Sequence, residues 1–148
     1  MAFLNSLDVS ASGMTAQRLR TDIISQNIAN VNTTRDENGD VYVRKTVVFE
    51  ELNSNAKSSF SSVLNSAMGY VGNGVKVSQI TEDTKSEMKK VYDPSNPDAD
   101  EDGYVTYPNV DVVQEMTNMI DASRSYEANV TAFNSTKNML LKTLEIGK

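Results

Sequence analysis

The last third of the chain carries a regular heptad pattern of apolar residues. If Val112 takes a d position, spacings of four and three residues alternate for more than four heptads. This narrow 3.5-residue period is typical of a coiled coil rather than of an ordinary surface helix. Pro108 blocks continuation toward the N-terminus and Asn109 or Asp111 can cap the first turn, so a helix is predicted over about 111–145. Its apolar stations are Val112, Met116, Met119, Tyr126, Val130, Phe133, Leu140 and Leu144, with Ser123 and Lys137 as polar interruptions.

The N-terminal segment repeats the pattern less regularly, and a helix is predicted there over residues 4–30. Its a and d stations complete the predicted assembly seam and are Leu4, Leu7, Ala11, Met14 and Ile28, with Arg18 among the polar interruptions. A second apolar stripe, Val9, Ala16, Leu19 and Ile23, lies on nearly the opposite side. The economical interpretation is that the chain itself buries one face and another subunit buries the other. A helix at the centre of a small bundle is the alternative.

The residues between the two helices have a different pattern. Apolar and polar side chains alternate over 41–49 after the Asn38-Gly39 turn signal, and two further strands are predicted over 75–80 and 90–92. One short helical face is predicted within 60–68. The predicted fold class is therefore α+β, mainly α, with the terminal helices paired as a coiled coil around a small β-containing insert. The predicted domains are 1–34 plus 109–148, and 35–108.

Composition excludes several classes of function. The chain has 148 residues, no His and no Cys, which removes the commonest general base, thiol chemistry and zinc–thiolate sites. No nucleophile motif or glycine-rich phosphate loop occurs, so no enzyme activity, cofactor or metal is predicted. A net charge of −6 argues against nucleic acid and anionic membranes as partners. No apolar run is long enough for a membrane span, and the N-terminus lacks the features of a cleaved secretory signal.

An acidic run resembles the opening of a calcium-binding EF-hand loop. Asp98, Asp100, Asp102 and Gly103 occupy loop positions 1, 3, 5 and 6, but position 12 is Asn109, where a bidentate Glu is needed. Prolines on both sides also exclude the flanking helices in the usual register. A solvated acidic turn is the favoured interpretation, and a calcium-regulated module is the minor alternative.

An asparagine-rich segment follows the N-terminal helix. Asn27, Asn30 and Asn32, with Thr33, lie where an apolar helix gives way to the middle of the chain. Asparagine favours helix ends and local side-chain-to-backbone hydrogen bonds. Since a simple helix end needs only one such residue, three indicate a specified turn that orients the middle module.

These residues resemble a known family. The stretch SQNIANVNTT at 25–34 resembles the signature of the bacterial flagellar axial proteins, which form the rod and hook, and 109–140 resembles their C-terminal helix. Further similarity at 6–30, 91–105 and 141–148 is closest to the basal-body rod members. The matching motif residues are Asn27, Asn30, Asn32, Thr33, Arg124, Tyr126 and Asn129.

The resemblance implies a structural subunit of the flagellar proximal rod. Such proteins leave the cell through the flagellar type III export apparatus without signal cleavage. They assemble with copies of themselves and other rod subunits into a helical tube that transmits torque and lines the export channel. Location in the envelope-spanning basal body follows from the same resemblance. A cytoplasmic coiled-coil adaptor or chaperone-like binding protein is the alternative function.

Overall fold

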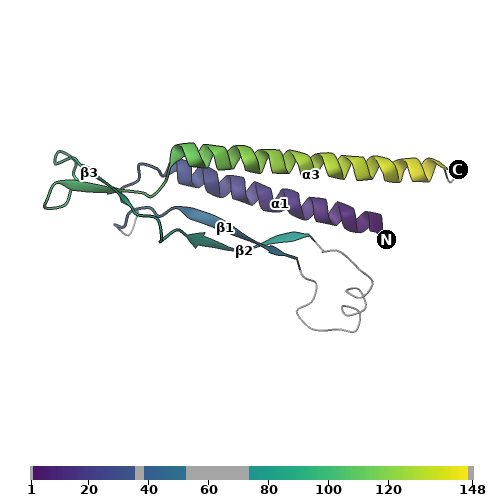
Figure 1. Ribbon diagram of the computed structural model, residues 1–148, viewed down its shortest axis with the longest axis horizontal. Coiled ribbons are helices and arrows are strands. Elements are labelled where there is room, and N and C mark those ends of the chain that lie inside the picture. Colours follow the sequence, from purple (N-terminus) through teal and green to yellow (C-terminus); the bar gives the residue numbers. More distant parts are fainter. Residues whose placement is uncertain (1, 36–38, 53–73, 147–148) are drawn as a thin grey trace, which may run out of the picture. The chain divides into compact units, whose positions relative to one another are not determined.

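The computed structural model describes residues 2–35, 39–52 and 74–146. The structure has two long helices, α1 (Ala2–Ala29) and α3 (Val112–Ile146), and four strands lie between them in the sequence (Figure 1). The strands are β1 (Lys45–Glu51), β2 (Val75–Glu82), β3 (Lys89–Tyr92) and β4 (Tyr104–Tyr107). This order confirms the predicted fold class, mainly helical with a small β part between the terminal helices. The helical face predicted within 60–68 lies outside the described residues.

The chain divides into two compact units, and each helix contributes to both. The first, here called the terminal unit, comprises Met1–Arg18, Phe49–Ser78 and Ser123–Lys148; the second, the junction unit, comprises Leu19–Val48 and Gln79–Ala122. The division predicted from the sequence, a helix domain and a β-containing insert, differs from these two units and stays a prediction.

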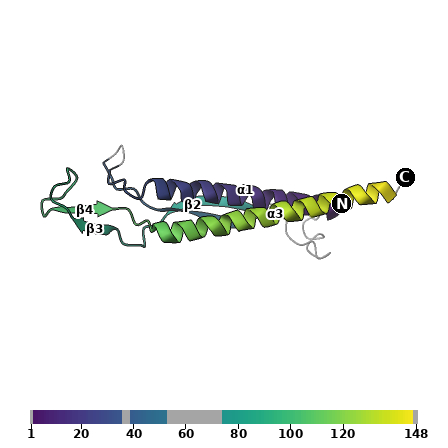
Figure 2. The same cartoon turned by 90° about the horizontal axis from the view of Figure 1, so that it is seen from above.

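The two helices run antiparallel in each unit. In the terminal unit, a Cβ on Gly13 would lie 2.9 Å from Asn129 Oδ1, so the two helices approach closely there. In the junction unit, Asn27 of α1 bonds to Glu115 of α3 at 2.9 Å. Within each unit, Figures 1 and 2 show the segments of α1 and α3 side by side and running in opposite directions. The contact face of α3 repeats every seven residues, through Glu115, Ala122, Asn129 and Thr136.

The start of α3 is capped as the sequence predicts. Asp111 Oδ1 accepts a hydrogen bond from the Val113 N–H at 2.9 Å, and satisfies one of the amides that a helix leaves unpaired. Of the two candidate caps, Asp111 therefore serves, while the Asn109 side chain bonds elsewhere. At its other end, α1 continues through Asn27 to Ala29, so Asn27 lies inside the last turn instead of terminating the helix.

The strands form two separate two-stranded sheets, β1 with β2 and β3 with β4. The β3–β4 pair is antiparallel, with Tyr92 opposite Tyr104 at one end and Lys89 opposite Tyr107 at the other. Strand β1 begins four residues later than the predicted 41–49, because the Arg44 N–H bonds to an asparagine side chain instead of a neighbouring strand. Strand β4 was not predicted, because its alternating pattern is only four residues long and directly follows the acidic run.

Candidate functional site

A cluster of buried polar side chains in the junction unit connects both helices to β1. We call it the polar junction: Asn27, Arg44, Asn109 and Glu115, with Tyr42 and Asp83 at its edge. Asn27 is 1% exposed and uses its full hydrogen-bonding capacity. Its Nδ2 donates to the Lys45 carbonyl at 2.8 Å and to Glu115 Oε2 at 2.9 Å. Its Oδ1 accepts from the Lys45 N–H and the Tyr42 hydroxyl, each at 2.9 Å.

Through these bonds, Asn27 acts toward Lys45 as a neighbouring strand residue would. It pairs with both backbone groups of Lys45 at the start of β1. Because backbone N–H and C=O groups in a folded chain need partners, the amide satisfies both groups of Lys45 in place of a neighbouring strand. Alanine or leucine at position 27 could provide none of these four bonds.

Glu115 is the charged centre of the polar junction. It is 1% exposed on the first turns of α3, and its Oε1 accepts from Arg44 Nη2 at 2.7 Å and Arg44 Nε at 3.0 Å. Asn118 Nδ2 also donates to this oxygen, at 3.1 Å. Together with the bond from Asn27, the carboxylate therefore has four donors. A buried charge is tolerated when it is paired and hydrogen-bonded in this way.

Asn109 and Asp83 complete the polar junction on the side of β2. Asn109 Oδ1 accepts from the Arg44 N–H at 2.9 Å, and its Nδ2 donates to the Asp83 carbonyl at 2.7 Å. The Asp83 N–H in turn donates to the Arg44 carbonyl at 2.8 Å, and the two side chains form an ion pair at 3.5 Å. Asn109, three residues before α3, is thus bonded to the residue that follows β2 and to the residue that precedes β1.

Two groups at the edge of the polar junction have displaced pKa values. Burial raises the pKa of the Tyr42 phenol above its usual value of 10.0, and the negative charges of Glu115 and Glu82 act in the same direction. Hydrogen bonds from the Ser86 hydroxyl and backbone lower the pKa of Asp83, and the Lys85 backbone and Arg44 add to the effect. Both shifts favour the charge state that each group already has at neutral pH, a neutral Tyr42 and an ionised Asp83.

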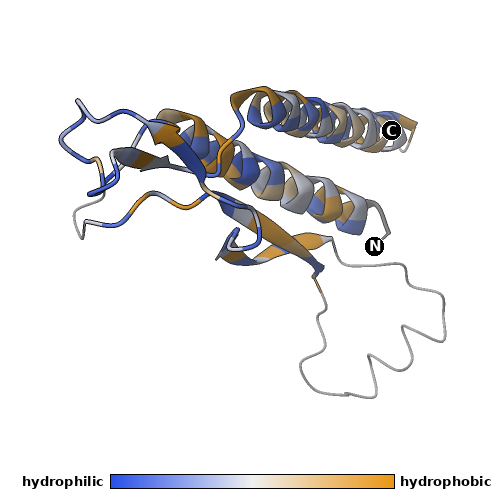
Figure 3. Cartoon of the chain, turned by 60° about the vertical axis from the view of Figure 1, so that its left-hand side comes forward, coloured by the Kyte–Doolittle hydropathy of each residue, from blue (hydrophilic) through white to orange (hydrophobic). Residues whose placement is uncertain are grey.

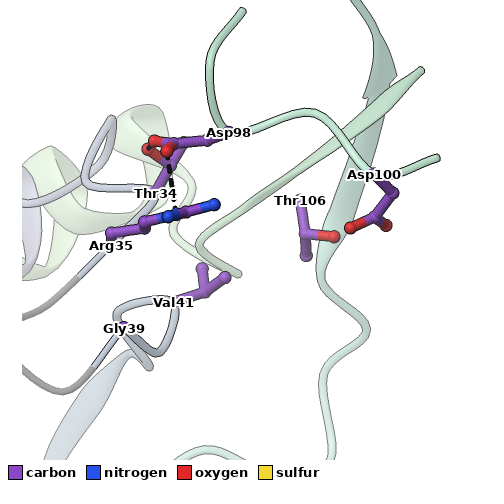
Figure 4. Close-up of a pocket in the computed structure, with 7 residues that line it drawn as sticks. All are labelled: Thr34, Arg35, Gly39, Val41, Asp98, Asp100 and Thr106. Carbon is purple, nitrogen blue, oxygen red and sulfur yellow. Dashed lines mark hydrogen bonds and ion pairs between the residues drawn. The ribbon is translucent and has the colours of Figure 1, made fainter.

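The chain leaves α1 through an ordered turn that is tied to the acidic run. Thr33 Oγ1 donates to Asn30 Oδ1 at 3.1 Å, as expected for a specified turn. Asp98 accepts a bond from Thr34 Oγ1 at 2.6 Å and pairs with Arg35 at 2.8 Å (Figure 4). Asp98 is therefore a structural residue and corrects the interpretation of the run as wholly solvated. No group of three or more His, Cys, Asp or Glu able to hold a metal ion occurs among the described residues.

A second tight contact, in the terminal unit, joins α1 to the start of β2. Gly74 has a φ of +103°, and a Cβ on it would lie 2.3 Å from Ser12 Oγ. The same hydroxyl accepts from the Val75 N–H at 3.1 Å and donates to the Val9 carbonyl at 2.7 Å. Only glycine combines this backbone conformation with so close an approach.

The predicted seam residues divide between partly covered and exposed positions. The half-buried ones are Leu7, Ala11, Met14, Ile28, Met119, Val130, Phe133 and Leu140; the exposed ones are Leu4, Val112, Met116, Tyr126 and Leu144. On α3, the fully buried positions lie one residue before the predicted a stations. On α1, the second stripe supplies the buried Ala16 and Ile23. The role of the seam in assembly stays a prediction.

Both helices consequently carry apolar side chains that their own chain leaves uncovered. Met116 is 55% exposed and Leu144 69% exposed, and Val113, Ile120 and Leu141 are also exposed. In Figure 3, apolar positions are spread along α1 and α3 among polar ones. Within the described residues, neither helix is both long and apolar enough to cross a membrane. Val113, Met116 and Ile120 are three and four residues apart and therefore share one face of α3, and contiguous exposed apolar surface marks sites of interaction with other proteins.

The family-motif residues differ in their contacts, and the sequence did not predict several residues that bond with them or form the second tight contact. Asn27 is the centre of the polar junction, and Asn129 packs against Gly13 and donates to the Ser125 carbonyl at 2.8 Å. Asn32, Arg124 and Tyr126 are exposed. The residues missed were Arg44, Glu115, Ser12 and Gly74. Glu115 lies between Gln114 and Met116, and nothing in this local sequence marks it as a buried residue.

Comparison with known proteins identifies the family. Residues 7–35 match the family model described as "Flagella basal body rod protein", and 101–146 match "Flagellar basal body rod FlgEFG protein C-terminal". The flagellar basal-body rod protein FlgC of Bacillus subtilis is 55% identical over the full length of both chains. FlgC of Borreliella burgdorferi is 43% identical over 99% of this chain and 98% of its own, and FlgC of Salmonella typhimurium is 41% identical over all of both. The chain belongs to the FlgC family of flagellar basal-body rod proteins.

Proposed function

We propose that this chain is a structural subunit of the bacterial flagellar basal-body rod. The observation that carries the proposal is the full-length similarity to FlgC rod proteins, at 55% identity for the Bacillus subtilis relative. The exposed apolar residues of α1 and α3 support it, because a free monomer gains nothing from them. Packing these faces against neighbouring subunits adds burial and dispersion energy that an isolated chain lacks.

In this proposal, the helices assemble with copies of themselves and with other rod subunits into a helical tube. The tube transmits torque and lines the export channel, and the subunit reaches it through the type III export apparatus without a cleaved signal. The predicted seam supplies the contacts between subunits. The polar junction fixes the two helices and β1 in one arrangement before those contacts form.

The experiment complements a strain that lacks this gene and measures swimming, basal-body number and the presence of the chain in purified basal bodies. Met116→Asp places a carboxylate on the exposed part of the seam, where burial against a neighbour would leave it unpaired. We expect a folded protein and few or no rods. Thr117→Asp is the matched control, since it adds the same charge at the adjacent exposed position outside the seam.

Two results would count against the proposal. One is normal swimming of the Met116→Asp strain, which would remove this residue from the subunit contacts. The other is a purified basal body that lacks the chain, which would reject the assignment to the rod itself.

A further inference from the structure

The β3–β4 hairpin presents a pair of exposed aromatic rings. Tyr92 and Tyr104 are opposite each other in the strand register and pack edge to face, with ring centroids 5.3 Å apart. Tyr92 is nevertheless 64% exposed and Tyr104 44% exposed. Tyrosine is enriched at the centres of protein interfaces, so an exposed pair of packed tyrosines is a candidate contact surface.

The connection between the strands holds these rings in place. Gly103, with a φ of +78°, lies directly against Tyr92: a Cβ there would be 3.0 Å from the ring carbon Cε2 and 3.3 Å from Pro94. The Asp93 N–H donates to the Gly103 carbonyl at 3.0 Å, and the Asp100 N–H donates to the Tyr104 carbonyl at 2.9 Å. A rigidly presented ring loses little conformational entropy when a partner covers it.

The charges beside the aromatic pair are strongly one-sided. Between residues 90 and 106 the chain has five carboxylates and one cation, Lys90. Asp98 is used by Thr34 and Arg35, as Figure 4 shows. The carboxylates of Asp100, Glu101 and Asp102 are exposed, and no basic group within the described residues pairs with them.

We propose that the hairpin face formed by Tyr92 and Tyr104 docks against a protein surface that carries arginine or lysine on a neighbouring rod subunit. The inference rests on the proposed function, because it names a contact within the rod. Guanidinium and ammonium groups bind over aromatic rings, and adjacent carboxylates strengthen that preference. The surface thus combines an aromatic anchor with a charge that selects a basic partner and disfavours an acidic one.

The test incorporates a photo-crosslinking benzoylphenylalanine at Tyr92, and separately at Tyr104, in flagellated cells. Basal bodies are then purified and the crosslinked peptides are sequenced. The matched control is the same residue at Tyr107, which lies on the opposite face of the same hairpin. We expect crosslinks from positions 92 and 104, but not from 107, to rod-subunit peptides that contain arginine or lysine.

A second arm changes the charge. Replacing Asp100, Glu101 and Asp102 together by lysine should reduce the crosslink from position 92 by roughly tenfold or more, because a close like charge opposes docking. Replacement of the same three residues by their amides should reduce it less. Tyr92→Ala with Tyr104→Ala should lower the number of rods per cell by a similar factor, whereas Tyr92→Phe should not.

The outcomes separate this inference from the assignment to the rod. If the chain is present in basal bodies and neither position 92 nor 104 crosslinks to a subunit, the docking surface is rejected while the rod function stands. Crosslinks to lipid, or crosslinks that charge reversal leaves unchanged, reject it as well. If the chain is missing from basal bodies, the proposed function fails together with the inference.

Discussion

The substitution Asn27→Asp tests the polar junction most directly, because it changes one side-chain nitrogen to oxygen at nearly constant volume. In the wild type, Asn27 Nδ2 donates to Glu115 Oε2 at 2.9 Å and to the Lys45 carbonyl at 2.8 Å. After the change, a carboxylate oxygen of residue 27 would face Glu115 Oε2 and the Lys45 carbonyl oxygen, where no hydrogen bond can form. Two hydrogen bonds would be lost, and a second carboxylate would be buried beside that of Glu115.

The expected cost follows from this geometry. Leaving a buried charge without compensation costs about 3–5 kcal/mol, and most single domains are stable by only about 5–15 kcal/mol. We therefore expect Asn27→Asp to remove much of the stability of the junction unit at pH 7. The matched control is Asn32→Asp, which adds the same charge at an exposed position and should change stability by about 0.5 kcal/mol or less.

The dependence on pH has a definite sign. Burial and the charge of Glu115 would raise the pKa of the new carboxyl in the folded chain above its value in the unfolded chain. A raised pKa favours folding at low pH, and this contribution is lost as pH rises through the folded pKa. The difference in stability between Asn27→Asp and the wild type should therefore shrink as the pH is lowered toward 4.

The assay is urea denaturation of the full-length chain, with amide hydrogen exchange of peptides from 19–29 and 112–122 as the local measure. Adding Glu115→Gln to Asn27→Asp restores one donor between the two helices, so the double variant should recover about 1–3 kcal/mol relative to additivity. Equal urea midpoints for Asn27→Asp and Asn32→Asp at pH 7 would refute the importance of the junction. An additive double variant would refute the direct coupling of residues 27 and 115.

Three further predictions concern other parts of the chain. In Gly74→Ala, the new Cβ would lie 2.3 Å from Ser12 Oγ on a backbone with a φ of +103°, so the free energy of unfolding should fall by about 1–3 kcal/mol in urea denaturation. An unchanged urea midpoint would show that β2 can move away from α1. Phe133→Asp should abolish swimming while the protein accumulates, whereas Asn134→Asp beside it should not; wild-type swimming of both would exclude Phe133 from the seam. Burial raises the pKa of Tyr42, so its contribution to folding stability should be lost as pH rises above 10. Tyr42→Phe should lose about 1 kcal/mol at neutral pH and lose less further stability over that rise than the wild type does; parallel pH curves for the two proteins would contradict it.

The long elements could be predicted from the sequence because their patterns are local and repeat many times. The heptads after Val112 and the capping residue Asp111 fix the position of α3 within one residue or two. Strand β2 begins where the alternating pattern predicts a strand over 75–80. Strand β4, with only four residues, gives a pattern too short to stand out beside the acidic run.

The polar junction could not be predicted, because its members are distant in the sequence. Arg44 and Glu115 are 71 residues apart, and neither has a local motif that names the other as its partner. Asn27 was noticed as one of three asparagines, but a helix-ending role was assigned to it, since its partner Lys45 becomes visible only when β1 lies beside α1. Similarly, Asp98 was interpreted as part of a solvated acidic turn, with a calcium site as the minor alternative, because its partners Thr34 and Arg35 are more than 60 residues away in the sequence.

The polar junction and the apolar helix faces contribute differently to assembly. Apolar contacts depend mainly on area, so helices held only by such contacts can shift along each other at modest cost. A buried network in which Asn27 and Glu115 each need particular partners is satisfied in one arrangement and costly in every other. We infer that the junction selects the arrangement of the subunit, while the exposed faces supply the energy of polymerisation. The inference fails if Asn27→Asp loses stability in the isolated chain and still forms rods in normal number.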